Sequence, residues 1–231
     1  MANVRKYKAT IVAIENKIDG VYTLTFDSEK EFKFSPGQFL HLAIDTEYDG
    51  SGQWPESRCF SLQSSPNEKN AKITYAVKGE FTRQMEKQLN IGTEVWLKLP
   101  YGELFEHNHD KNKTVFIAGG TGVTPFLSLF TDQSFLVYEN PKIYLGFRSK
   151  EYNIYQSALN KMMKIRENLS TMLQIRYENE VGIIDINEIF EQNGTDANYF
   201  ISGPPIMIKL FRQKLIEKGV SDINILTDDW E

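Results

Sequence analysis

A glycine-rich turn is the part of the sequence best suited to chemistry. The apolar run 114–118 stops at Gly119-Gly120-Thr121-Gly122, and Val123-Thr124-Pro125 follows. Glycines at such a point let backbone N–H groups face a phosphate with no Cβ in the way. Thr124 is a candidate helix N-cap, with Pro125 at the first helical position. The pattern predicts a cradle for a dinucleotide phosphate, although the same glycines would also suit a helix packed closely on its strand.

The composition is that of an ordinary globular protein. The chain has 231 residues, of which 41% are hydrophobic and 25% charged. A formal charge of −5 without a Lys/Arg stripe argues against nucleic-acid binding. No apolar stretch approaches the roughly 20 residues that span a bilayer, and the N-terminus has no apolar signal segment. The sequence therefore predicts a cytoplasmic protein that binds neither nucleic acid nor membrane.

Metal and disulfide chemistry find little support in the sequence. Cys59 is the only cysteine, which excludes an internal disulfide and an iron–sulfur cluster held by four cysteines of this chain. His107 and His109 lie in a polar segment with no third ligand in view. We expect no metal site.

The first hundred residues have the rhythm of short strands. Alternating apolar and polar residues occupy 8–14, 21–26, 39–44, 72–77 and 94–99, with turn residues between them. A short helix is expected near 82–89. Many short strands at this spacing predict a small antiparallel barrel.

Strands and helices alternate after residue 113. Strands are expected at 115–118, 142–146, 172–177, 199–202 and 223–226, and helices from Pro125 and near 156–167, 186–192 and 206–218. Such alternation predicts a parallel sheet with helices on its faces and ligands at the carboxyl ends of its strands. We place the domains at 1–108 and 109–231.

Four motifs occur in a characteristic order. They are Arg58-Cys59-Phe60-Ser61, Gly79-Glu80-Phe81-Thr82, the turn from Gly119 to Pro125, and Ser202-Gly203-Pro204-Pro205. With them the chain resembles the ferredoxin–NADP reductase family over essentially its whole length. The resemblance implies an N-terminal FAD-binding antiparallel β-barrel followed by a Rossmann-like NAD(P)-binding domain. It also implies hydride transfer from NAD(P)H to flavin, with FAD favoured over FMN.

The resemblance assigns the barrel residues to the flavin. Arg58 would bind its phosphate, Phe60 would stack on its ring, and Ser61 would lie near the nitrogen that accepts hydride. The cofactor-binding residues expected in the barrel are Arg58, Cys59, Phe60, Ser61, Gly79, Phe81 and Thr82. Family members usually carry tyrosine where this chain has Phe60, so a hydroxyl contact to the flavin side chain is lost.

The resemblance assigns the second set of motifs to the nicotinamide nucleotide. Gly120, Thr121 and Gly122 would hold its diphosphate, Thr124 would touch either nucleotide or flavin, and Gly203 and Pro204 would lie beside the nicotinamide. Ser202 stands where a cysteine near the hydride path is common in the family, so slower transfer is expected.

The C-terminal tail offers a further candidate residue. In plant-type members a C-terminal aromatic covers the flavin, which Trp230 could do here, with Asp228 near the acidic position before it. A tail pinned to the sheet edge is the alternative. Ser61, Ser202 and Trp230 are the candidate catalytic residues.

The choice of nucleotide and of electron acceptor stays open. Arg148, Ser149 and Lys150 lie where a 2′-phosphate would fall, which favours NADPH slightly over NADH. The expected acceptor is a ferredoxin or flavodoxin, or else an oxygenase component. Two alternatives remain: a reductase that uses flavin as a loosely bound substrate, and a non-catalytic nucleotide-binding or redox-sensing subunit.

Overall fold

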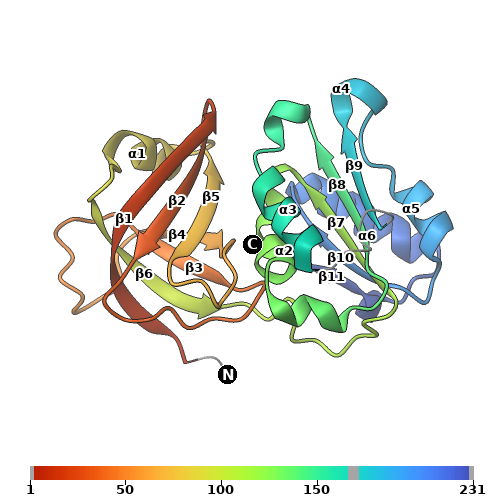
Figure 1. Cartoon of the computed structure of the whole chain (residues 1–231), viewed down its shortest axis with the longest axis horizontal. Helices are drawn as coiled ribbons and strands as arrows, with labels where there is room; N and C mark the ends of the chain where they lie inside the picture. The colour runs from red at the N-terminus through yellow and green to blue at the C-terminus, as the bar shows by residue number, and fades with distance from the viewer. Residues whose placement is uncertain (1–2, 166–171, 229–231) are drawn as a thin grey trace.

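Two sheets lie side by side in the computed structural model, which describes residues 3–165 and 172–228 (Figure 1). The first sheet has six strands in the order β4-β3-β6-β1-β2-β5, and all its paired strands are antiparallel. The strands are β1 (Arg5–Ile18), β2 (Val21–Asp27), β3 (Phe39–Ala43), β4 (Ser57–Ser61), β5 (Ala71–Ala76) and β6 (Glu94–Tyr101). The predicted antiparallel, barrel-like domain is confirmed.

Alternation along the strands directs the apolar side chains into the barrel. Leu40 and Leu42 of β3 are fully buried, whereas His41 between them faces the outer side and is half-buried. The two ends of the sheet meet where the Gln63 N–H donates to the Lys72 carbonyl oxygen over 2.8 Å. Helix α1 (Glu80–Gln88) adds Phe81 and Met85 to the same core.

The second sheet has five parallel strands in the order β11-β10-β7-β8-β9. These are β7 (Thr114–Gly119), β8 (Lys142–Phe147), β9 (Leu173–Tyr177), β10 (Asn198–Ser202) and β11 (Ile225–Thr227). Its helices are α2 (Thr124–Phe130), α3 (Gln156–Ile165), the short α4 (Glu178–Val181), α5 (Ile186–Asn193) and α6 (Pro205–Glu217). The predicted α/β domain is confirmed. Within the described residues, no helix is long and apolar enough to cross a bilayer.

Separate apolar cores cover the two faces of this sheet. Phe116 and Ala118 of β7 pack with α2 and α3, while Val115 and Ile117 pack with α5 and α6. Strand β7 is the central strand of the sheet. The next strand in sequence, β8, lies on one side of β7, and the later strand β10 lies on the other side. The strand order therefore reverses between β7 and β10, where a doubly wound sheet opens a ligand crevice at the carboxyl ends of its strands.

Several predicted element boundaries differ from the structure. The prediction of Thr124 as an N-cap is wrong: Val123 is the cap residue of α2, because Gly120–Val123 already form a 3₁₀ turn. The Thr124 hydroxyl instead donates to the Thr121 carbonyl oxygen over 2.9 Å. Strand β11 begins later than predicted because Asp222–Asn224 form another 3₁₀ turn. The predicted end of α3, at 166–167, lies outside the described residues.

The turns after β7 and β10 touch through glycines. A Cβ on Gly122 would lie 2.4 Å from the Gly203 Cα, closer than side chains approach backbone. Gly203 has a φ of +153°, and a Cβ there would lie 3.1 Å from the Gly119 nitrogen. The bare backbones therefore pack directly against each other, and this contact fixes the shape of the crevice at the switch point.

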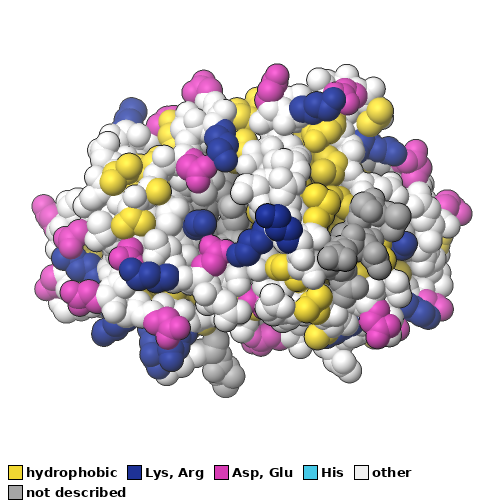
Figure 2. Space-filling view, viewed as in Figure 1, with side chains coloured by type: hydrophobic (Ala, Val, Ile, Leu, Met, Phe, Trp, Pro, Cys, Tyr) yellow, Lys and Arg dark blue, Asp and Glu magenta, His cyan; other side chains and the backbone are white. Residues whose placement is uncertain are grey.

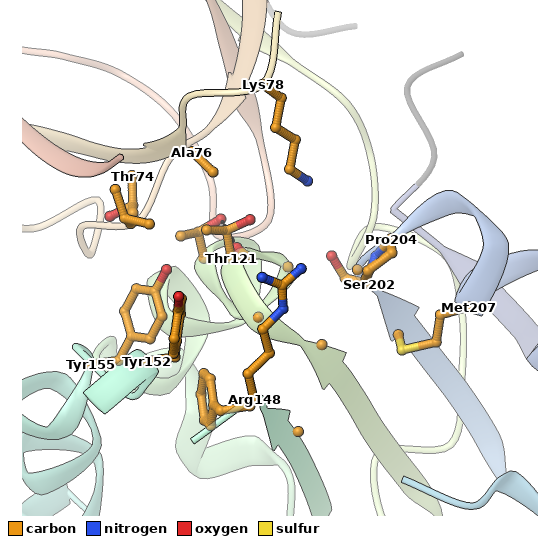
Figure 3. Close-up of a pocket in the computed structure, with 18 of the residues that line it drawn as sticks. Thr74, Ala76, Lys78, Thr121, Arg148, Tyr152, Tyr155, Ser202, Pro204 and Met207 are labelled. Atoms are coloured by element: carbon orange, nitrogen blue, oxygen red, sulfur yellow. Dashed lines mark hydrogen bonds between the residues drawn. The ribbon is translucent and has the colours of Figure 1, made fainter. Parts of the chain in front are cut away.

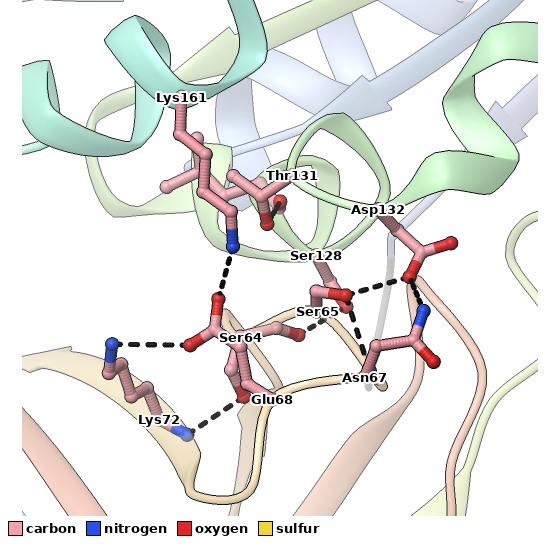
Figure 4. Close-up of polar contacts among 10 residues, drawn as sticks. Ser64, Ser65, Asn67, Glu68, Lys72, Ser128, Thr131, Asp132 and Lys161 are labelled. Atoms are coloured by element: carbon pink, nitrogen blue, oxygen red, sulfur yellow. Dashed lines mark hydrogen bonds and ion pairs between the residues drawn. The ribbon is translucent and has the colours of Figure 1, made fainter. Parts of the chain in front are cut away.

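A polar network joins the two domains beside the crevice (Figure 4). The Asp132 carboxylate accepts hydrogen bonds from the Ser65 hydroxyl and the Asn67 amide, both at 2.7 Å. Glu68 of the barrel forms an ion pair with Lys161 of α3 at 2.8 Å. The Ser128 hydroxyl of α2 donates to the Ser64 carbonyl oxygen over 2.8 Å. These buried and half-buried contacts hold the domains in one relative orientation.

Replacing Gly122 by alanine should destabilise the protein by about 3 kcal/mol, because a methyl group forced against the Gly203 backbone has nowhere to go. Gly120→Ala is the matched control, since its Cβ would meet open space and only its φ of +56° is unfavourable, a cost of about 1 kcal/mol. Urea unfolding measures both variants. An equal or smaller loss for Gly122→Ala would refute the packing role of this glycine.

Replacing Asp132 by asparagine should cost about 1–3 kcal/mol, because an amide N–H₂ then faces hydrogen-bond donors. Asp196→Asn, an exposed partner of Lys113 at 3.8 Å, should change stability by less than about 0.5 kcal/mol. Urea unfolding of the two variants at neutral pH makes the comparison. Equal stability of the two variants would mean that the network does not hold the domains together.

The contribution of Asp132 should also depend on pH. Burial alone would raise the pKa of Asp132, but hydrogen bonds from Ser134, Ser65 and Asn67 outweigh it and lower the pKa below its ordinary value of 3.8. The stabilisation is thus present above about pH 4 and is lost as the pH falls through the lowered pKa. The stability gap between wild type and Asp132→Asn should close in acid.

Candidate functional site

One large cavity of about 940 Å³ lies between the two domains (Figure 3). Its barrel wall comes from the end of β4, from β5 and from the β1–β2 hairpin. The opposite wall comes from the carboxyl ends of β7, β8 and β10 and from the start of α6. The volume lies at the upper end of the roughly 300–1,000 Å³ typical of cofactor and ligand sites. The switch point of the parallel sheet thus opens toward the barrel.

Most of the predicted site residues line this cavity. They are Cys59, Phe60, Ser61, Gly120, Thr121, Gly122, Thr124, Arg148, Ser202, Gly203 and Pro204. The barrel motif and the two turn motifs, far apart in the sequence, therefore meet in one space.

A carboxylate at the junction joins serines from the two domains. The Ser202 hydroxyl, at the end of β10, donates to Asp228 Oδ2 over 3.1 Å, and the Ser61 hydroxyl of β4 reaches the same oxygen over 3.4 Å. Asp228 follows β11 and is only 8% exposed. Its own N–H donates to the Ile201 carbonyl oxygen over 3.0 Å, which fixes the backbone beneath the carboxylate. The hydroxyl groups of Ser61 and Ser202 therefore both form hydrogen bonds to the same oxygen of Asp228.

The barrel wall beside this trio includes the aromatic side chain of Phe60 and the thiol of Cys59. Phe60 is partly buried, and its ring lies 6.0 Å from that of Tyr75. Cys59 lies beside the His41 ring, with 3.5 Å between Sγ and Nε2. Burial raises the pKa of the Cys59 thiol and lowers that of His41, so both side chains are uncharged at neutral pH. This part of the wall, at Cys59 and Phe60, suits an aromatic ring.

Another group of predicted residues lies outside the cavity, around the start of α1. The Arg58 guanidinium lies 5.1 Å above the Phe81 ring and pairs with Glu56 at 3.0 Å. The Phe81 side chain itself is buried in the barrel core. The Thr82 hydroxyl accepts from the Gly79 N–H and donates to the Gly79 carbonyl oxygen. Arg58 therefore lies beside the N-terminal end of a helix.

Two predicted residues fall elsewhere. The Ser149 hydroxyl donates to the Glu151 carboxylate over 3.1 Å, outside the cavity. Trp230 lies outside the described residues.

The cavity also contains residues that the motifs did not indicate, among them Thr74, Lys78, Tyr152, Tyr155, Arg176 and Met207. Figure 3 shows Lys78 reaching in from the barrel and Arg148 from the end of β8 on the opposite side. The only sequence signal for Lys78 was its position directly before Gly79. Two cations facing one cavity suit a ligand with phosphate groups.

Metal binding and a nucleic-acid surface find no support in the described structure. Within residues 3–165 and 172–228, no three His, Cys, Asp or Glu side chains group together as metal ligands. Figure 2 shows basic and acidic side chains interspersed on the visible face.

Comparison with known proteins agrees with this geometry. Residues 116–213 match the oxidoreductase NAD-binding domain family. Sulfhydrogenase 2 subunit gamma of Pyrococcus furiosus is 26% identical, over 94% of this chain and 81% of that subunit.

Two solved structures illustrate that the fold is shared over nearly the full length of this chain. Flavohemoglobin from Malassezia yamatoensis, with bound FAD and heme, superposes with a TM-score of 0.78 at 22% identity, over 96% of this chain and 59% of that one. Ferredoxin–NADP⁺ reductase from Plasmodium falciparum with 2′P-AMP superposes with a TM-score of 0.73 at 20% identity, over 97% and 96% of the two chains. These findings agree with the resemblance indicated by the motifs: residues 116–213 match the oxidoreductase NAD-binding domain family, and the chain has the same two-domain fold as the ferredoxin–NADP⁺ reductase from Plasmodium falciparum.

Proposed function

We propose that this chain is a flavoprotein reductase that takes hydride from NAD(P)H onto bound FAD and passes the electrons to a separate acceptor protein. The observation that carries the proposal is the large cavity between the domains. It brings Phe60 and Ser61 of the barrel together with the glycine turns at the switch point of the parallel sheet. A flavin on the first wall and a nicotinamide on the second would meet inside it.

The residues present fit a flavin on the barrel side. Phe60 offers its ring as a stacking surface, and the uncharged Cys59 adds to an apolar wall. Arg58 lies near the start of α1, where its charge and the helix N–H groups suit the phosphates of the cofactor. Because Glu56 pairs with Arg58, a bound phosphate would have to share or replace that carboxylate. A related fold with bound FAD supports FAD as the flavin.

The nucleotide would lie along the opposite wall. Gly120, Thr121 and Gly122 expose backbone at the start of the turn after β7, where a diphosphate would meet N–H groups. Gly203 and Pro204 present the backbone edge for the nicotinamide ring. The direct packing of Gly122 on Gly203 keeps these two subsites at a fixed distance.

When bound, the flavin supplies the hydride acceptor. Ser61 and Ser202 supply hydroxyl groups on the two sides of the transfer point, and Asp228 holds both through one oxygen. The chain thus contributes mainly the placement of two rings, which is a large part of catalysis when reacting atoms must approach closely.

The electron acceptor is proposed to be another protein. The single cysteine excludes a four-cysteine cluster within this chain, so a cluster of that kind would have to lie in a partner. A ferredoxin or flavodoxin is our first candidate and an oxygenase component the second. The relative from Pyrococcus furiosus is named as one subunit of a larger enzyme, which supports a role within an electron-transfer assembly.

The test is the visible absorbance spectrum of the purified protein and its response to NAD(P)H without oxygen. A yellow protein whose flavin bands bleach supports the proposal. A colourless protein that oxidises NAD(P)H only when flavin is added would instead indicate a flavin reductase. Nucleotide binding without turnover, with or without flavin, would indicate a regulatory subunit.

Ser202→Ala and Asp228→Ala should each slow flavin reduction, the second by more, because both serine hydroxyls then lose their acceptor. We expect an effect on the order of tenfold or greater for Asp228→Ala. Flavin content should stay unchanged, since neither residue lies at the phosphate end of the site. Stopped-flow absorbance measures the rate, and Ser157→Ala, which removes an exposed hydroxyl of α3, is the control. A rate equal to that of the control would contradict the placement of the transfer point.

A further inference from the structure

A second, smaller cavity of about 230 Å³ lies between the two domains. Its barrel wall comes from β1, β2 and the segment 63–72, and its opposite wall comes from Thr131 and from α3 with the residues before it. Ile154 and Tyr155 line both this cavity and the large one. The volume is below the roughly 300–1,000 Å³ of typical cofactor sites, so the space suits a small molecule and not a second nucleotide.

Tyr155 brings a buried hydroxyl group to this cavity. The residue is 3% exposed, and its hydroxyl has no hydrogen-bond partner within the described residues. Figure 3 shows the ring directed toward Thr74 of β5, but the Thr74 hydroxyl already donates to Gln63 Oε1 and is hydrogen-bonded to the Thr23 hydroxyl. Burial raises the pKa of Tyr155, so the group keeps its proton and can donate it. An unpaired buried donor is unfavourable, and an acceptor atom of a bound ligand would satisfy it.

Two further sets of donors border the same space. Because Gln63 Oε1 accepts from Thr74, the Gln63 side chain has its N–H₂ group left for other partners, and Gln63 lines the cavity. Tyr155 and Ala158, at the start of α3, line it as well. The Leu159 N–H donates to the Tyr155 carbonyl oxygen, and the N–H groups before it have no acceptor within the helix. The start of α3 therefore favours negative charge.

Lysines outnumber carboxylates on the cavity wall. Lys17, Lys72 and Lys161 line it together with Glu15 and Glu68. Glu68 is shared between two lysines, with Lys161 at 2.8 Å and Lys72 at 3.3 Å (Figure 4). Burial alone would raise the pKa of Glu68, but the hydrogen bonds and charges of these lysines lower it, so the carboxylate stays charged. Lys17 pairs with Glu15 at 3.0 Å, and the wall keeps one positive charge in excess.

From these groups we infer that the cavity binds a small oxyanion, a short carboxylic acid or a phosphate, which accepts a hydrogen bond from the Tyr155 hydroxyl and lies at the start of α3 near Lys17. Both kinds of anion offer the acceptor oxygens and the negative charge that these donors require. Since the walls belong to both domains, the bound anion would join the barrel to α3. The inference is independent of the proposed function, because it needs neither flavin nor nucleotide.

The test is isothermal titration of the purified protein with malonate and with inorganic phosphate, with sodium chloride holding the ionic strength constant. The wild type should bind one of the two oxyanions saturably, and the tighter one identifies the chemistry of the ligand. Tyr155→Phe, which removes only the hydroxyl, should weaken that binding about tenfold or more. Lys17→Gln should weaken it about threefold. Lys69→Gln is the matched control, because Lys69 is an exposed barrel lysine paired with Asp27 outside the cavity.

A further variant identifies which cavity the anion occupies. Arg148 faces the large cavity, so Arg148→Gln should leave the affinity unchanged. Weaker binding by Arg148→Gln but not by Lys17→Gln would place the anion in the large cavity and overturn the inference. Absence of saturable binding of either anion, or an unchanged affinity in Tyr155→Phe, would also overturn it. Circular dichroism checks that each variant is folded, and Lys17→Gln, at a side chain 52% exposed, carries the test if Tyr155→Phe is not.

Discussion

The contact between the turns after β7 and β10 is made of backbone alone, and the site depends on it. Gly122 packs on Gly203 with no room for a methyl group, and Gly203 in turn lies against Gly119. This contact draws together two strand ends at the point where the strand order of the sheet reverses. The diphosphate turn and the serine at the end of β10 can share one cavity only because glycine stands at these positions.

The second constraint is the orientation of the barrel. Ser61 meets Asp228 and Ser202 only if the barrel lies against the parallel sheet in one arrangement. Asp132, held by Ser65 and Asn67, fixes that arrangement on one side of the crevice. Stability and function are therefore linked here, since a loosened domain junction would separate the groups that must align two rings.

The sequence predicted the parts of the structure that rest on local chemistry. Alternating strands, the strand–helix rhythm after residue 113 and the turn from Gly119 to Pro125 each follow from backbone preferences within a few residues. The missed features depend on contacts between distant segments. Asp132 accepts hydrogen bonds from Ser65 and Asn67 of the other domain. Glu180, in the short helix after β9, forms an ion pair with Lys150, which follows β8. Thr124 looked like a cap because the extra 3₁₀ turn before α2 has no clear sequence signal.

The central claim is that one cavity holds flavin and nicotinamide close enough for direct hydride transfer. Its most direct test is oxygen-free stopped-flow reduction of the purified flavoprotein by NADH and by NADH deuterated at the transferred position. We predict bleaching of the flavin bands with a primary isotope effect on the observed rate. Absence of bleaching, with nucleotide and flavin both bound, would contradict the account, because the two rings would then not meet in this cavity.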